Sequence, residues 1–285
     1  MSYSANISTA SRAMSTDQLR QAAPSIFATE PYFKMSQRYA FIPTIDIVEK
    51  MQNEGFMPVK ADQSRCRIKG KADFTKHMVR FRHVDYLSDT LQAVGVEIPE
   101  IVLVNSHDGA SGYQIHAGLF RLICANSMVS AGATFDSINV RHSGKIVDDV
   151  IEGSFRVIDG IPALMDSIDG MKKVDLDRDE QLAFSRAATE IRYPSDEHGN
   201  STAPFSPEKL LAPKRVYYGD DKLPTLWNTF NNIQENYMKG GLRGIGRTGR
   251  RTTTRAIKSV NADLATNRAL WILAESMKEL KQQAA

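Results

Sequence analysis

Apolar residues along the chain change their spacing near residue 145, and this change predicts two structurally different halves. Before residue 145 they alternate with polar residues or gather in short runs, as in β-strands. After it they recur every three or four positions, as on one face of an α-helix. The pattern therefore predicts an α+β fold, with a mostly antiparallel sheet with hairpins in the N-terminal half and a mainly α-helical C-terminal half.

Domain organisation follows from the same pattern and from the composition of the N-terminus. Residues 1–34 are rich in Ser, Ala and Thr, and we expect a weakly ordered arm in which Ser15 caps one short helix. We expect residues 35–285 to form a single α+β domain. Within it, residues 56–144 should be sheet-rich and residues 145–285 helical.

A pair of strands is expected at the start of the sheet-rich region. A helix capped by Thr44 and ended by Gly55 should lead into it, because glycine tolerates the left-handed conformation that often ends a helix. The second strand, FTKHMVRFRHV, alternates apolar and basic residues, so that Arg80 and Arg82 share one face. We expect this basic face to be either solvated or part of a nucleic-acid-binding surface.

A hairpin is predicted from the stretch EIVLVNSHDGASGYQIHAGLF, where Asp-Gly and Ser-Gly supply the turn chemistry. Its turn brings Asn105, His107 and Asp108 close together, and loops held by a rigid sheet often carry function. One hypothesis is a metal-assisted nuclease site with His107 as general base or metal ligand. The other is a structural turn in which Asn105 and His107 contact bound nucleic acid.

The second hypothesis is preferred, because the spacing of His and Cys residues is not that of a zinc site. We therefore assign no catalytic residue, no metal ligand and no cofactor. Cys66 and Cys124 are expected to be free thiols, and no apolar run approaches the roughly 18 residues of a membrane span. These features favour a cytoplasmic protein that does not enter a membrane.

Four long helices are expected in the second half, together with a short one over SPEKLLA that Ser206 caps. A long amphipathic helix should begin near Lys145 and bend at Pro162, and another should follow Asp177. A third should end at Gly240, and a fourth should be capped by Asn261. The expected packing seam of the fourth helix consists of Leu270, Leu273, Met277 and Leu280.

Charge is distributed unevenly along the chain. The 285 residues include 36 Lys+Arg and 33 Asp+Glu, a formal net charge of +3. One glycine-rich stretch, residues 239–258, holds seven basic residues and no acidic ones, so the rest of the chain carries 3 − 7 = −4. Charge of one sign that is gathered in one place attracts phosphate. The seven residues are Lys239, Arg243, Arg247, Arg250, Arg251, Arg255 and Lys258.

This basic stretch allows three interpretations: a nucleotide-binding loop, a nucleic-acid-binding arm or a solvated linker. The residues Gly244 to Gly249 match G-x-G-x-x-G, but a dinucleotide site needs a strand before the glycines, and here a helix is predicted. Arg250 and Arg251 also stand where a phosphate loop needs Lys and Ser/Thr. Because arginine suits bidentate phosphate contacts, we favour an adaptable arm over a linker.

Several long motifs resemble one protein family. They are VLVNSHDGASGYQIHAGLFRLICANSMV, VRHSG, TLWNTFNNIQENYMKGG and RRTTTRAIKSVNADLATNRALWILAE. Together they are similar to a family of phage- and plasmid-borne proteins known only as a domain of unknown function. The resemblance covers nearly everything after about Phe33. It implies a setting, mobile elements in the bacterial cytoplasm, and it assigns no reaction and no catalytic residue.

The resemblance and the basic arm together suggest a function. Phages and plasmids often encode single-strand annealing proteins, and a sheet-and-helix core with a basic arm is similar in kind to these, although no motif matches. We expect a non-enzymatic, homo-oligomeric protein that binds nucleic acid, with single-stranded DNA first, in recombination or replication. The alternatives are the nuclease and an accessory protein that binds a host protein to blunt defence.

Overall fold

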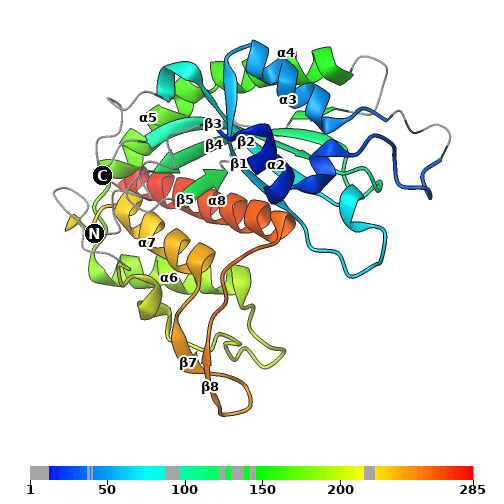
Figure 1. The fold of residues 1–285 in the computed structure, drawn as a ribbon. Coiled ribbons are helices and arrows are strands. Elements are labelled where there is room, and N and C mark those ends of the chain that lie inside the picture. Colours follow the sequence, from blue (N-terminus) through cyan, green and yellow to red (C-terminus); the bar gives the residue numbers. More distant parts are fainter. Residues whose placement is uncertain are drawn as a thin grey trace, which may run out of the picture. The chain divides into compact units, whose positions relative to one another are not determined.

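The computed structural model describes residues 13–36, 39, 41–87, 97–121, 126–129, 138–140, 146–214 and 222–284. The chain divides into two compact units, Met1–Ile161 and Pro162–Ala285. The first contains an antiparallel sheet and the second is mainly helical, so the predicted α+β class is confirmed (Figure 1). The sequence predicts one domain over residues 35–285. The structure instead divides after Ile161, shortly beyond residue 145, where the sequence predicts the change from sheet to helix.

The N-terminal segment is packed from Ser15 onward. Ser15 begins helix α2 (Thr16–Ala22) with a capping box, in which its hydroxyl accepts from the Gln18 amide at 3.3 Å and the Gln18 side chain accepts from the Ser15 amide at 2.8 Å. Leu19 and Ile26 are buried. Where the sequence predicts a weakly ordered arm, apolar side chains of the described residues thus pack into the core.

The sheet has six strands in the order β1-β2-β3-β4-β5, with β6 also paired to β4, and every pair is antiparallel. The predicted hairpin is the pair β3–β4, and Gly109 in its turn has a φ of 78°. Both faces of β3 are buried. The strands are β1 (Phe56–Gln63), β2 (His77–His83), β3 (Glu97–Asn105), β4 (Tyr113–Arg121), β5 (Asn126–Val129) and β6 (Ile138–Val140).

Besides α2, which contacts β1, two more helices of the first unit pack on the sheet. Helix α3 (Thr44–Asn53) contacts β1, and α4 (Ile146–Asp159) contacts β3, β4 and β6. Gly55 follows α3 with a φ of 86°, as predicted. The predicted Thr44 cap is wrong: Pro43 occupies the cap position, and the Thr44 hydroxyl turns instead into the protein interior.

The helical unit contains α5 (Ile161–Lys172), α6 (Arg178–Arg192), α7 (Leu226–Lys239) and α8 (Val260–Ala284). The connections contain short 3-10 turns. Those of the first unit are η1 (Pro24–Phe27), η2 (Ala72–Phe74) and η3 (Val84–Tyr86), and the second unit contains η5 (Pro207–Leu210). The long bent helix that was predicted from Lys145 is two helices, α4 and α5, separated at Gly160. Proline is tolerated near a helix start, which explains why Pro162 lies in the first turn of α5 rather than at a bend.

Helix α7 forms the centre of the helical unit and contacts both α6 and α8. Trp227 stacks on Phe230, whose ring meets the edge of Trp271 from α8. The predicted α8 seam is only partly right. Leu270 is buried, but Leu280 is exposed, and Trp271 and Ala274 are also buried.

Candidate nucleic-acid interface

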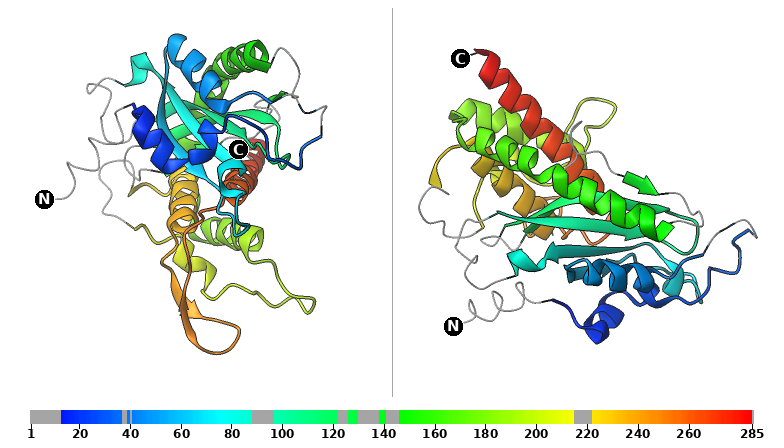
Figure 2. Two further views of the ribbon diagram at one scale, coloured as in Figure 1. Left: turned by 45° about the vertical axis from the view of Figure 1, so that its right-hand side comes forward. Right: turned by 90° about the horizontal axis from the view of Figure 1, so that it is seen from above.

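The basic stretch forms a two-stranded hairpin, β7 (Arg243–Ile245) and β8 (Arg251–Thr253), which extends from the end of α7 (Figure 2). The Gly246 amide donates to the Arg250 carbonyl at 2.9 Å, and the Gly249 amide donates to the Gly246 carbonyl at 2.9 Å. With a φ of 72° at Gly249, this is a three-residue hairpin loop that needs glycine at its left-handed position. Regular structure thus replaces the irregular arm that the sequence predicts.

Cations from the helical unit fix the base of this hairpin by donating to backbone carbonyls. Arg192 donates from Nη1 to Tyr237 at 2.7 Å and from Nη2 to Arg255 at 2.6 Å, which joins the end of α7 to the strand that leaves the hairpin. Lys209 donates to the Arg243 carbonyl at 2.8 Å. The base is therefore held at both strands.

One face of the hairpin lies against the segment that precedes η5. The Ile245 amide donates to the Pro204 carbonyl at 2.7 Å. A Cβ added at Gly244 would lie 1.5 Å from that carbonyl oxygen, a distance that no side chain can occupy. The glycines of the G-x-G-x-x-G match are thus explained by hairpin geometry, since a strand and not a helix follows them.

Replacing Gly244 by Ala should detach the hairpin from Pro204, because the added methyl group overlaps backbone; such overpacking costs about 1–3 kcal/mol or more. The matched control is Gly246→Ala, whose Cβ would lie 3.6 Å from the nearest atom, an ordinary contact. Limited trypsin digestion at Arg247 and Arg250 should accelerate in Gly244→Ala alone. Equal cleavage rates in both variants would contradict the packing described here.

Most of the positive charge on this hairpin has no acidic partner among the residues that the structure describes. Lys239 pairs with the buried carboxylate of Glu235 at 2.8 Å. The pKa of Asp196 is lowered chiefly by the Asn200 amide and only slightly by the charge of Arg247, which makes no ion pair with it. Within the described residues, no carboxylate lies within ion-pair distance of the other six basic side chains, all exposed. These are Arg243, Arg247, Arg250, Arg251, Arg255 and Lys258.

The strand register places basic and apolar side chains together on the other hairpin face. Arg243 lies opposite Thr253, and Ile245 lies opposite Arg251, so these four residues share a face. The side chain of Ile245 is 64% exposed. An isoleucine between arginines on an open surface can contact an apolar group while the arginines hold phosphates.

Arg80 and Arg82 do not form the predicted basic surface. Both are buried, and both contact the carboxylate of Glu100 on the neighbouring strand: Arg80 Nη1 lies 3.3 Å from Oε2, and Arg82 Nη2 lies 2.8 Å from Oε1. Gly118, opposite Glu100 on β4, leaves room for the Arg80 guanidinium. The prediction of a solvated or nucleic-acid-binding face is therefore wrong in this structure, because the pattern did not reveal the pairing carboxylate.

Asn105 and His107 are also buried, within a polar network centred on Thr44. The Thr44 hydroxyl lies 2.9 Å from His77 Nε2 and 3.1 Å from His107 Nε2, and it accepts from Asn105 Nδ2 at 3.1 Å. Neither residue reaches a surface that a nucleic acid could touch. The prediction that they contact nucleic acid is corrected: they help to hold α3 against the sheet.

His77 is neutral in this network. Its Nδ1 lies 3.0 Å from the Thr75 carbonyl, which can only accept, so Nδ1 carries the proton and Nε2 accepts from Thr44. Burial disfavours the imidazolium and lowers the pKa of His77 to about 4.

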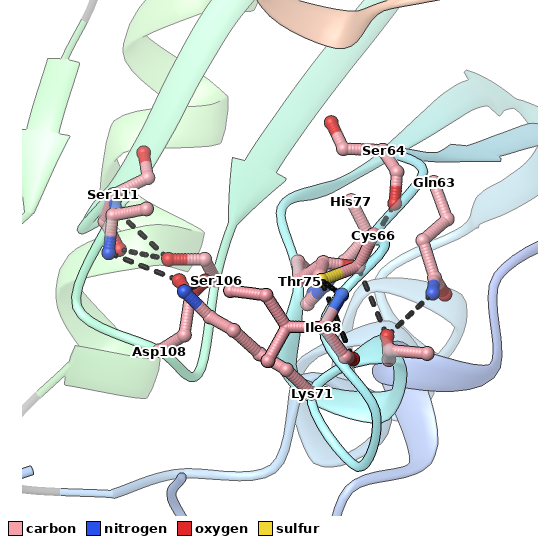
Figure 3. Close-up of polar contacts among 12 residues, drawn as sticks. Gln63, Ser64, Cys66, Ile68, Lys71, Thr75, His77, Ser106, Asp108 and Ser111 are labelled. Atoms are coloured by element: carbon pink, nitrogen blue, oxygen red, sulfur yellow. Dashed lines mark hydrogen bonds and ion pairs between the residues drawn. The ribbon is translucent and has the colours of Figure 1, made fainter. Parts of the chain in front are cut away.

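Asp108 serves as a turn residue. Its Oδ1 accepts from the Ala110 amide at 3.0 Å, and its Oδ2 pairs with Lys71 at 3.0 Å (Figure 3). Burial by itself raises the pKa of Asp108, but the hydrogen bonds from Lys71 and Ala110 outweigh this effect and lower it. With His107 buried, the geometry gives the nuclease hypothesis no support.

Other candidate chemistry is limited. Across the residues that the structure describes, no three His, Cys, Asp or Glu side chains gather as a metal site requires. Cys66 is a free cysteine, whereas Cys124 lies outside the described residues. None of the described helices is long and apolar enough to cross a membrane.

A second basic segment, residues 64–76, was missed by the sequence reasoning. It contains five Lys or Arg residues and one acid, in the pattern R-x-R-x-K-x-K. This density of charge was a usable signal. In the structure β1 ends at Gln63, so these cations lie in the loop that follows the strand.

The fold and the site together define an α+β protein whose helical unit carries an exposed basic hairpin. The chain belongs to the family described as "Domain of unknown function (DUF932)", whose pattern matches residues 33–271. It is similar to two proteins of Escherichia coli (strain K12), UPF0380 protein YafZ and UPF0380 protein YfjQ. Each is 37% identical over 273 residues, which is 96% of this chain and 94% of the relative. No solved structure matches.

Proposed function

We propose that this protein binds nucleic acid through the β7–β8 hairpin, without catalysing a reaction, and that single-stranded DNA is its ligand. The observation that carries the proposal is the group of six exposed basic side chains on and beside the hairpin, with no described carboxylate in ion-pair distance. Such a group releases condensed counterions when it meets a phosphate backbone, which drives binding that is independent of sequence.

Single strands fit this surface better than duplexes for a physical reason. Arginine forks bind phosphates in pairs of hydrogen bonds, and an apolar side chain such as Ile245 can rest on the face of an unpaired base. In a duplex the base faces are stacked and hidden. A face with both kinds of side chain therefore favours an unpaired strand.

The biological setting forms part of the same proposal. We place the protein in the bacterial cytoplasm, on a phage or plasmid, where it acts in recombination or replication in the manner of single-strand annealing proteins. Such proteins work as assemblies along a strand, so we also propose a homo-oligomer.

The test compares two triple variants that remove the same charge. The hairpin variant has Ala in place of Arg247, Arg250 and Arg251. The control variant has Ala in place of three exposed arginines of α6 and α8, Arg178, Arg186 and Arg268. Each phosphate contact contributes about 0.7 log units of affinity per tenfold change in salt concentration. Losing three contacts should therefore lower the affinity roughly 100-fold at 0.1 M salt. Fluorescence anisotropy with labelled oligonucleotides measures this loss.

The hairpin variant should lose affinity for every sequence alike, since phosphate contacts carry no base information. The control variant should bind as the natural protein does. Equal losses in the two variants would reduce the effect to net charge and contradict the proposal, as would the absence of any binding at low salt.

A further inference from the structure

The loop that joins β1 to β2, residues 64–76, carries a second group of exposed cations, on the unit that does not contain the hairpin. Arg65, Arg67 and Lys69 are all exposed. The only acid in the loop is Asp73. Within the described part of the chain, none of the three cations makes an ion pair. The fourth, Lys71, is neutralised by Asp108.

Hydrogen bonds hold the base of this loop in one conformation. The Ser64 amide donates to the Lys76 carbonyl at 2.8 Å, and the Thr75 hydroxyl donates to the Ser64 carbonyl at 3.0 Å (Figure 3). The pair of Lys71 with Asp108 ties the loop to the β3–β4 turn. The three cations are thus held near one another despite their repulsion, which an anionic ligand would relieve.

Two apolar side chains of the same unit, Ile68 and Phe33, are exposed. Ile68 lies between Arg67 and Lys69 in the sequence, is 58% exposed, and has its amide bonded to Cys66 Sγ at 3.4 Å, which turns the chain at the tip. Phe33 is 78% exposed. A ring this open on a protein surface is available to stack on another flat group.

Tyr32 connects Phe33 to the loop. Its ring centroid lies 4.6 Å from that of Phe33 and 5.6 Å from that of Phe74, and Lys71 Nζ lies 5.5 Å from its centre. Lys34 Nζ lies 5.7 Å from the centre of the Phe33 ring. The open ring of Phe33 therefore lies beside the end of the loop that contains Lys71 and Phe74.

We propose that this surface is a second binding site for single-stranded nucleic acid, in which Arg65, Arg67 and Lys69 hold phosphates and Phe33 stacks on a base. Proteins that bind single strands without sequence preference combine these two elements, a basic track and an aromatic platform. The inference rests on the proposed function for its ligand class, but it uses different residues on a different unit.

A tryptophan at position 33 reports on this site alone. The natural residues Trp227 and Trp271 are buried, so the exposed indole in Phe33→Trp is the one that a ligand can reach. Titration with oligothymidylate of about 30 nucleotides, longer than the roughly 4–16 nucleotides of one single-strand site, should quench its emission to saturation. Ile272→Trp, on the exposed side of α8, is the control and should not be quenched.

Substitutions in the loop should then weaken the quenching. With Arg65, Arg67 and Lys69 replaced by Ala, the concentration for half-maximal quenching should rise roughly 100-fold at 0.1 M salt, by the arithmetic of three phosphate contacts. Replacing the exposed Lys50, Lys60 and Arg156 of the same unit removes equal charge and should not change it. A duplex of equal length should quench far less, because its base faces are covered.

The outcomes separate this site from the hairpin. Quenching in Phe33→Trp that persists when Arg247, Arg250 and Arg251 are alanines supports the loop site, even if the hairpin proposal fails. No quenching at oligonucleotide concentrations that saturate binding by anisotropy would overturn the loop site and leave the hairpin proposal standing. Equal quenching by duplex, or by vesicles of anionic lipid, would also overturn it. An absence of both quenching and binding would remove both proposals.

Discussion

Replacing Glu100 by Gln should lower the free energy of unfolding by about 3–5 kcal/mol, the usual cost of removing one partner from a buried ion pair. Glutamine keeps the shape of the side chain but not its charge. The guanidinium groups of Arg80 and Arg82 would then face a neutral amide while they remain buried. Denaturant unfolding measures the change in the free energy of unfolding. Hydrogen exchange of the β2 and β3 amides measures it in the unit that contains these strands.

A variant without any of these charges is the matched control. Replacing Arg80 and Arg82 by Met and Glu100 by Leu removes all three of these charges, and well-packed apolar replacements of buried ion pairs are often neutral or stabilising. This triple variant should therefore be more stable than Glu100→Gln. A Glu100→Gln variant as stable as the natural protein would contradict the contribution of this ion pair to stability.

Stability should also fall between about pH 6.5 and pH 4 because of His77. The folded-state pKa of about 4 lies below the ordinary value of 6.5, so over this range the unfolded chain takes up a proton that the folded protein does not. Stability is thus present in full above pH 6.5 and lost as the pH falls. The loss at pH 4 amounts to about 3 kcal/mol, at 1.36 kcal/mol per pKa unit.

The variant His77→Gln isolates this effect, because glutamine keeps a donor and an acceptor but does not titrate. The pKa of Asp108 is lowered, so its own contribution disappears only at lower pH, below the ordinary carboxyl value. Denaturation midpoints measured at several pH values should therefore fall less steeply in the variant between pH 6.5 and 4. Parallel curves for the two proteins would show that His77 is not buried in its neutral form.

The elements that the sequence predicts correctly depend on local signals. The capping boxes of α2 and α6 require only a side chain and a partner three residues later, as at Ser15 and Asp177. The β3–β4 hairpin likewise follows from its turn residues and from the apolar runs on either side. Such features need no knowledge of distant parts of the chain.

The errors concern partners that are distant in the sequence. The alternation through Arg80 and Arg82 resembles a half-exposed strand, but Glu100, on the next strand, makes a buried site for both. Glu100, which has apolar residues on both sides in the stretch EIPEIVLVN, was an available sign of a buried pair, since Glu is almost never fully buried without a partner. The Thr44 cap failed for the same reason, because its hydroxyl bonds to His77 and Asn105 from other strands.

The sequence predicts the basic residues of the candidate interface but not the hairpin that carries them. Its basic residues stand out from charge alone, but the strand pairing does not, because Gly244 and Gly246 weaken any strand pattern and the contact with Pro204 is unpredictable from either segment. The loop of residues 64–76 carried a similar charge signal and was overlooked. Where charge is concentrated could therefore be predicted, whereas the surface on which it is displayed required the structure.

The dependence of single-strand affinity on salt tests the central proposal most directly. Six phosphate contacts at the hairpin predict a slope of log affinity against log salt concentration of about −4, and three more at the loop would bring it to about −6, at roughly 0.7 per contact. A slope in this range that becomes shallower by about 2 when Arg247, Arg250 and Arg251 are alanines is the predicted result. A slope near zero, or no binding of single strands at low salt, would contradict the account.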